Sequence, residues 1–387
     1  MPKKGLEIRN LGAPIRFTDV GPLAGFAAES AKGGQQVRVW HRLNLTSEDK
    51  DFHRMAEGLS GVVRHLAQKA GKLIDLQRAN DVLLLLRPDA TAELWIDSAA
   101  RIVECTLKGS IGAGDLVLER DIVDVRAMKF PCVDIGERGK VLFLFREGWR
   151  FGMAFDMNPE GNLDRREFET SLGALYRRLK YKHLYDALGE PAVLKKLVHA
   201  GWFPFAEIIT SEFRDVLNHC LAGFEMAEVD DEIIQKFDAA RLEKILERWV
   251  AKPHFSVKSD LLRAAMKHFQ MKEPVAVIKL ILTEIEGVLD GAYRAANGGK
   301  GAKTKELIKF AAESAEQKAG RSDTLFFPQE FAAYLSEHTF ASFDPMTRSG
   351  KANSRHAVGH GAAPQDEYTM PRALQAILTL DQIAFYT

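Results

Sequence analysis

The chain has 387 residues, 46% of them hydrophobic and 27% charged. This length exceeds one typical domain, and this composition excludes a disordered or fibrous protein. The 53 basic and 53 acidic side chains cancel, which excludes a strong overall attraction to nucleic acid or to a membrane surface. Any contact with nucleic acid must therefore come from a local patch.

The sequence lacks the marks of a secreted or membrane protein. Met1–Leu6 include two lysines, but no apolar stretch follows them, so no signal peptide is expected. The longest apolar run, Val82–Leu86, is far shorter than the roughly 20 residues that a membrane-spanning helix needs. Cys105, Cys132 and Cys220 form no Cys-x-x-Cys pair and are expected to be reduced thiols. We therefore expect a cytoplasmic protein without membrane contact.

The first half of the chain mixes helical and strand-like periods. A start signal at Ser47, followed by apolar residues at helical spacing, predicts a helix over 47–66. Short apolar runs then predict strands at 82–86, 92–96, 102–107, 116–118 and 141–145. The last of these strands is expected to pair with 151–155 across a tight turn. Several strands with short connections predict a largely antiparallel sheet.

After a predicted helix over 167–188, the strand signal disappears. Apolar residues at helical spacing predict helices at 202–220, 231–250, 259–269, 274–293 and 326–340, a lysine-rich helix ending near 318, and a last helix starting at Thr369. The expected fold class is α+β. A mixed α/β domain with a largely antiparallel sheet spans 1–190, a helical connector spans 191–254, and an all-helical domain spans 255–387.

The most informative segment lies between a turn-rich loop and the last predicted helix, where residues 353–361 read NSRHAVGHG. Arginine is permanently cationic and can bind a phosphate through two N–H groups. Histidine gives or takes a proton near neutral pH. Arg355 and His360 together therefore predict cleavage of a phosphodiester without metal, with the cation stabilising the crowded phosphorane and the imidazole moving the proton.

The spacing of this segment also constrains its shape. Arg355 and His360 would lie about 140° apart on an ideal helix, whereas His356 and His360 would share a face. Gly359 and Gly361 each destabilise a helix by roughly 1 kcal/mol relative to alanine. We therefore predict a helix start or a bent turn here, in which His356 positions phosphate or acts as a second proton carrier.

This segment and an upstream acidic helix, ILTEIEGVL over 281–289, resemble the HEPN superfamily. These proteins are small helical bundles whose signature is an arginine, four to six residues, and a histidine. The segment is similar to the Asn-Arg-His-x-x-x-His-Gly form of bacterial HEPN proteins, some of which are linked to abortive-infection defence. Ser354 stands where that form has asparagine, and Asn353 lies one place earlier. The resemblance covers roughly 255–387.

The resemblance implies an endoribonuclease that needs no metal or cofactor and works as a homodimer through its helical domain. His360 would take the proton from a ribose 2′-OH or protonate the leaving 5′-oxygen, and Arg355 would bind the scissile phosphate. Asn353 and His356 would support the site. Glu286 would orient Arg355 or His360, the alternative being a rim carboxylate bound to a lysine.

By analogy with two-part defence proteins, the N-terminal half would sense an unidentified phage trigger and restrain a toxin-like effector that cuts RNA. Two other functions remain open. A non-catalytic HEPN-like module would bind RNA or a nucleotide, or serve in assembly. A metal hydrolase would use His356 and His360 as zinc ligands, although Ala357 stands where such an enzyme places its glutamate base.

Two basic stretches offer weaker signals. The lysine-rich residues 300–321 are expected to form either a phosphate-attracting rim or a solvated helix face. Residues 176–183 interleave bases and aromatics, which is typical of nucleic-acid surfaces and equally of a helix that packs its rings inward.

Overall fold

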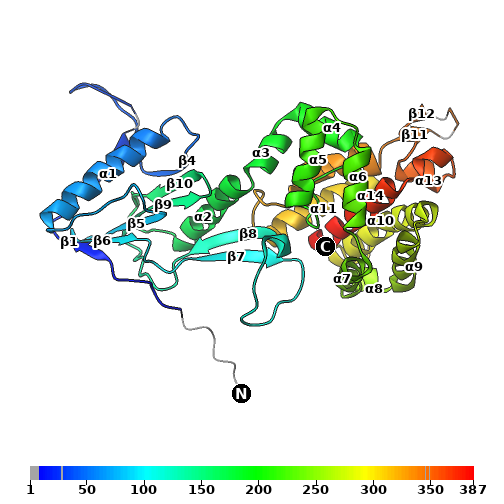
Figure 1. Ribbon diagram of the computed structural model, residues 1–387, viewed down its shortest axis with the longest axis horizontal. Helices are drawn as coiled ribbons and strands as arrows, with labels where there is room; N and C mark the ends of the chain where they lie inside the picture. Colours follow the sequence, from blue (N-terminus) through cyan, green and yellow to red (C-terminus); the bar gives the residue numbers. More distant parts are fainter. Residues whose placement is uncertain (1–7, 28, 345, 348) are drawn as a thin grey trace, which may run out of the picture. The chain divides into compact units, whose positions relative to one another are not determined.

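The computed structural model describes residues 8–27, 29–344, 346–347 and 349–387, and Figure 1 shows the course of the chain. The expectation about a signal peptide concerns residues outside this described part. The chain forms two compact units. The sheet unit consists of the residues up to Cys105 together with Val125–Lys182, and the helical unit consists of Thr106–Asp124 and His183–Thr387. The predicted boundary at 190 thus falls inside the helical unit.

The sheet unit is built on one six-stranded sheet, whose antiparallel character was predicted; the strands at 15–17 and 42–46 were not predicted, and the predicted strand 102–107 lies in a separate two-stranded sheet. Its strands, in spatial order, are β1 (Ile15–Phe17), β6 (Ala92–Ile96), β5 (Asp81–Leu86), β9 (Lys140–Glu147), β10 (Arg150–Asp156) and β4 (Arg42–Thr46). Every neighbouring pair is antiparallel. β9 and β10 form the expected hairpin, and Gly148 in the turn has a φ of 60°, a conformation that favours glycine.

One helix covers each face of this sheet, because successive strand residues point to opposite faces. Leu84 packs with the buried side chains of α1 (Phe52–Lys69), whereas its neighbour Leu83 packs with those of α2 (Arg165–Lys180). Leu84 lies opposite Leu94 on one side and Leu142 on the other. The central strand β5 is therefore buried on both faces, which explains its unbroken apolar sequence.

Some predicted elements of the first half differ from the structure. Residues 116–118, predicted as a strand, form a loop in which Leu116 is 87% exposed, since three apolar residues without a pairing partner cannot sustain a strand. The predicted helix over 167–188 is interrupted at Tyr181, which is buried and ends α2. The remaining elements are β2 (Phe26–Ala27), β3 (Val39–Trp40), β7 (Ile102–Leu107), a 3₁₀ turn (Glu119–Asp121) and β8 (Ile122–Lys129).

The helical unit confirms the predicted helical character of the second half. Its elements are α3 (Lys182–Gly189), α4 (Pro191–His199), α5 (Ser211–Ala222), α6 (Ala227–Gln235), α7 (Ala239–Val250), α8 (Pro253–Ser256), α9 (Ser259–Gln270), α10 (Pro274–Ala296), α11 (Thr304–Ala319), α12 (Pro328–Tyr334), a π-helical turn (Leu335–Thr339), β11 (Phe343–Asp344), β12 (Ser349–Gly350), α13 (Arg355–Gly359), a 3₁₀ turn (Gln365–Glu367) and α14 (Met370–Tyr386). In the described ranges, none of these helices or those of the sheet unit has both the length and the apolar character to span a membrane.

Two predicted long helices, over 202–220 and 231–250, differ from the structure: the first starts only at Ser211, and the second is broken. The second breaks because Asp238 accepts a hydrogen bond from the backbone N–H of Arg241 (2.8 Å) and so caps a new helix, α7. Segment 191–254, predicted as a connector, packs within the same unit as 255–387.

The C-terminal helix α14 lies at the centre of the helical unit and contacts α6, α7, α9, α10 and α11. Almost all of its side chains are buried, including polar ones. Gln375 donates to the carbonyl of Ala200 (2.9 Å), and Gln382 accepts from the backbone N–H of Ala206 (2.7 Å). These bonds tie the buried loop before α5 to α14.

A buried network of charges joins α7 to α14. Arg248 donates to Asp381 (2.8 Å) and to Glu207 (2.9 Å). Arg241 pairs with Glu207 (2.9 Å), and Lys108 donates to the backbone carbonyl of Glu207 (2.6 Å). Burial raises the pKa of Asp381 and lowers the pKa of Lys108. Charges this deep are tolerated because each one has an opposite partner or a hydrogen bond.

The contact between α2 and β8 predicts that Gly173→Ala destabilises the sheet unit. A Cβ at this position would lie 2.7 Å from Ala127 Cα and 2.8 Å from its backbone nitrogen, which cannot move without shifting β8. We expect a loss of about 1–3 kcal/mol in the free energy of unfolding, measured by urea denaturation. Gly58→Ala on α1, where the added Cβ meets nothing within 4 Å, should instead stabilise by up to about 1 kcal/mol. Equal stability of both variants would contradict the packing described.

The buried network predicts that Arg248→Met destabilises the helical unit by about 3–5 kcal/mol, because Asp381 loses its cation while remaining buried. The double variant Arg248→Met/Asp381→Leu should recover part of this loss. The matched control is Arg263→Met, which removes an exposed arginine 3.5 Å from Glu243 and should change stability by at most about 1 kcal/mol. Thermal unfolding of the four proteins would measure both effects.

Candidate functional site

The segment predicted to carry the chemistry forms the short helix α13. Ser354 caps its start by accepting a hydrogen bond from the backbone N–H of Ala357 (3.3 Å). Ala357 and Val358 are buried and anchor the helix to the unit. Gly361, with a φ of 67°, follows the helix end at once. Arg355 is therefore the first residue of α13, and His360 is its C-cap.

The structure brings Arg355 and Glu286 together. Arg355 Nη2 forms an ion pair with Glu286 Oε2, and Glu286 Oε1 accepts a hydrogen bond from Thr304 Oγ1 (2.9 Å). Glu286 lies on α10 and Thr304 starts α11, so one carboxylate links three helices. The lysine-bound carboxylate is a different residue, Glu284, which pairs with Lys258.

This ion pair has two consequences for the cation. It anchors one terminal nitrogen, Nη2, of the Arg355 guanidinium, whereas Nε is buried without a hydrogen-bond partner. It also offsets the charge, so an incoming phosphate would have to use the remaining N–H donors or displace Glu286. The two side chains are 28% and 26% exposed, which leaves the pair accessible from solvent.

The two histidines of the segment differ in environment. His360 is exposed, and its backbone N–H donates to the carbonyl of His356 (3.0 Å). His356 is half-buried, and burial lowers the pKa of its imidazole; Arg355 lowers it further, against an opposite effect of Glu286. His356 therefore gives up its proton more readily than a free imidazole, whereas His360 is exposed to solvent.

Asn353 contributes its backbone carbonyl, and not its side chain, to the hydrogen bonds beside α13. Its carbonyl accepts a hydrogen bond from Arg372 Nη2 (3.0 Å), while its side-chain oxygen is buried without a hydrogen-bond partner. Arg372 Nη1 also lies 2.7 Å from His338 Nε2, and Lys351 Nζ lies 2.6 Å from His338 Nδ1. Sequence reasoning missed Arg372 and Lys351 and considered His338 only as a possible third zinc ligand. The available signal was a charged residue, Arg372, among the apolar positions of the last helix.

The basic stretches contribute little to the site. Lys309 on α11 is 76% exposed and lies 3.4 Å from Glu313, as expected of a solvated helix face. In the stretch 176–183, Arg177 and Tyr181 are fully buried. Arg177 donates to the backbone carbonyl of Val125, so this side chain serves packing of the sheet unit rather than a surface.

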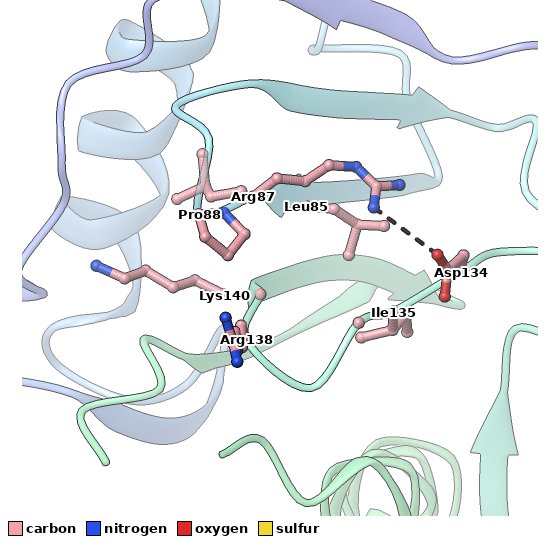
Figure 2. Close-up of a pocket in the computed structure, with 10 residues that line it drawn as sticks. Leu85, Arg87, Pro88, Asp134, Ile135, Arg138 and Lys140 are labelled. Atoms are coloured by element: carbon pink, nitrogen blue, oxygen red, sulfur yellow. Dashed lines mark ion pairs between the residues drawn. The ribbon is translucent and has the colours of Figure 1, made fainter. Parts of the chain in front are cut away.

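No cluster of three or more metal-binding side chains occurs in the part of the chain that the structure describes. A separate cavity of about 70 Å³ lies in the sheet unit, lined by Arg87, Arg138, Lys140 and Asp134 among others. Figure 2 shows Arg87 reaching towards Asp134, and the two charged groups are 3.8 Å apart. Arg87 also pairs with Glu93 (3.2 Å). This cavity is well below the roughly 300 Å³ of a typical ligand pocket.

Comparison of the chain with protein-family models, with curated proteins and with solved structures found no match. The chemistry of the site must therefore be inferred from its own residues. These are an oriented guanidinium, Arg355, and an exposed imidazole, His360, at the two ends of one short anchored helix.

The electrostatics of α13 predict opposite effects of two substitutions on the pKa of His356. Arg355→Met removes a neighbouring positive charge and should raise this pKa, whereas Glu286→Gln removes a negative charge and should lower it further. The measurement is an NMR titration of the imidazole C–H signals. Glu284→Gln on the same helix is the control and should leave the titration unchanged. Shifts of the same sign in both variants would contradict the arrangement of charges described.

Proposed function

We propose that the protein is a metal-independent endoribonuclease, with a HEPN-like helical unit as its effector. The observation that supports this most is that Glu286 holds the guanidinium of Arg355 at one end of α13 while His360 stands exposed at the other. A fixed cation and a mobile proton carrier are what phosphodiester cleavage by an internal hydroxyl requires.

In the proposed reaction, His360 removes the proton from a ribose 2′-OH, and the freed oxygen attacks the adjacent phosphorus. Arg355 binds the non-bridging phosphate oxygens and stabilises the charge that develops on them. The bond to the 5′-oxygen breaks, and that oxygen takes up a proton. The products carry a 2′,3′-cyclic phosphate and a 5′-hydroxyl. DNA lacks the attacking hydroxyl and is not cut.

We further propose that the active form is a homodimer through the helical unit. Within one copy, Arg355 and His360 lie at opposite ends of α13, about 140° apart around an ideal helix axis. A second copy related by a two-fold axis would bring a second arginine and histidine into the same cleft. The sheet unit would then act as the sensor that restrains this cytoplasmic nuclease until a phage trigger is present.

One observation favours a second candidate, a non-catalytic module that binds RNA or a nucleotide. The ion pair with Glu286 already offsets the charge of Arg355, which is also what a structural salt bridge does. In that case the protein binds its ligand without turnover, and His360 is dispensable. The metal hydrolase that uses His356 and His360 has no comparable support.

The proposed nuclease mechanism predicts that His360→Ala and Arg355→Ala each reduce RNA cleavage by at least about 100-fold. The assay is cleavage of total cellular RNA by purified protein in EDTA, with analysis of the product ends. His268→Ala is the matched control, because this histidine lies on α9 and pairs with Glu273 (2.5 Å). Circular dichroism would show that all variants keep the fold.

Full activity in either site variant would contradict the mechanism. Binding of RNA without cleavage, retained in His360→Ala, would favour the non-catalytic module. Loss of cleavage in EDTA, restored by zinc, would favour the metal hydrolase.

A further inference from the structure

A buried group of three basic residues, Arg372, His338 and Lys351, lies behind the segment that starts α13. Arg372 is 3% exposed and His338 is 1% exposed, and Lys351 is half-buried. Within the described residues, no carboxylate lies at ion-pair distance from Arg372. The buried Asp381 on the same helix as Arg372, α14, has a cation partner, Arg248, so the environment of Arg372 is different and needs its own explanation.

The numbers of hydrogen-bond donors and acceptors determine which nitrogen atoms of this group carry protons. A neutral imidazole has one N–H donor and one acceptor nitrogen, and arginine can only donate. His338 Nε2, which lies 2.7 Å from Arg372 Nη1, must therefore be the acceptor, so Nδ1 carries the hydrogen. That hydrogen faces Lys351 Nζ at 2.6 Å. An ammonium group has no acceptor, so the hydrogen bond from His338 to Lys351 forms only when Lys351 is an uncharged amine.

The groups around Lys351 allow it to be either charged or uncharged near pH 8. Burial lowers the pKa of Lys351 to about 8, Arg372 lowers it as well, and Glu367 and Glu337 act in the opposite direction. Burial and the two cations hold the pKa of His338 well below its usual value, although the backbone carbonyl of Val198 favours the charged ring. The other groups that face this cluster are His199, beside His338, and Tyr334, beside Arg372.

The same group holds the backbone in front of α13. Arg372 Nη2 donates to the carbonyl of Asn353 (3.0 Å), two residues before Arg355. The backbone N–H of Ser354, the cap residue of α13, donates to the carbonyl of Lys351 (3.2 Å). A change at Lys351 or Arg372 is therefore transmitted to the first turn of α13.

We infer that Arg372 is a positioning residue for the Arg355/His360 site, and that it holds the start of α13 firmly only while Lys351 is an uncharged amine. When Lys351 is charged, it and Arg372 both present donors to one imidazole, and one of the two contacts must open. The group is thus complete above about pH 8 and strained below it. The part of this inference that concerns catalysis rests on the proposed nuclease. The part that concerns how Arg372 holds α13 does not depend on it.

Two variants of Lys351 separate the two states. Lys351→Gln keeps an acceptor for His338 and cannot become charged, so it imitates the amine. Lys351→Arg is a permanent donor and imitates the ammonium. The first readout is amide hydrogen exchange of Ala357 and Val358, whose N–H groups bond to Ser354, as protection factors corrected for the intrinsic effect of pH.

Between pH 7 and pH 9, protection of these amides should rise several-fold in the wild type. It should stay high at both pH values in Lys351→Gln and low at both in Lys351→Arg. Lys309→Gln, at an exposed lysine of α11, should behave like the wild type. The same protection in wild type, Lys351→Gln and Lys351→Arg, or low protection in Lys351→Gln, would overturn the inference.

RNA cleavage is the second readout and separates this inference from the proposed function. If the nuclease is real, Lys351→Arg should lower kcat more than it raises KM, and Lys351→Gln should remove the part of the pH profile that reports Lys351. Exchange as expected without any cleavage by the wild type would reject the nuclease and keep the inference. Cleavage with unchanged exchange would reject the inference and keep the nuclease.

Discussion

The helical unit depends on the pairing of Asp381 with Arg248 in its interior. Asp381 lies on the buried helix α14, and it accepts hydrogen bonds from Arg248 and from the indole N–H of Trp249 (2.9 Å) on α7. Arg248 also reaches Glu207, whose pKa is lowered because three cations outweigh the opposite effect of burial. A carboxylate at this depth is stable only with such partners, so the position of α14 between its neighbours is set by this pairing as well as by its apolar side chains.

The buried charged residues at the two ends of α14 have different kinds of partner. At the C-terminal end, Asp381 has a full cation partner. At the N-terminal end, a neutral imidazole and a backbone carbonyl accept hydrogen bonds from Nη1 and Nη2 of Arg372 without offsetting its charge, and its Nε is buried without a partner. The first arrangement pairs opposite charges, whereas we infer that the second depends on the protonation of Lys351. This second arrangement is bonded to the backbone just before α13, which begins with Arg355.

The sequence predicted the regular parts of this fold well, because apolar periodicity reports directly on burial. The antiparallel sheet, the β9–β10 hairpin and the helical second half all follow from it. It failed at 116–118, where apolar residues are exposed, and at the breaks of the long helices. Glu286 was singled out because it stands among apolar neighbours. The grouping of Arg372, His338 and Lys351 was missed, since hydrogen bonds between residues 13 and 34 positions apart leave no periodic trace.

The ion pair between Arg355 and Glu286 has a consequence for selectivity. A ligand that uses this guanidinium competes with an anion already in place, and Glu286 is itself held by Thr304. Ligands with one weakly basic oxygen gain too little to displace a carboxylate, whereas a phosphodiester in a cleft that also engages its neighbouring groups can do so. The ion pair thus sets a threshold of affinity. For the proposed RNA ligand, this threshold would be overcome by a polyanion bound at several points.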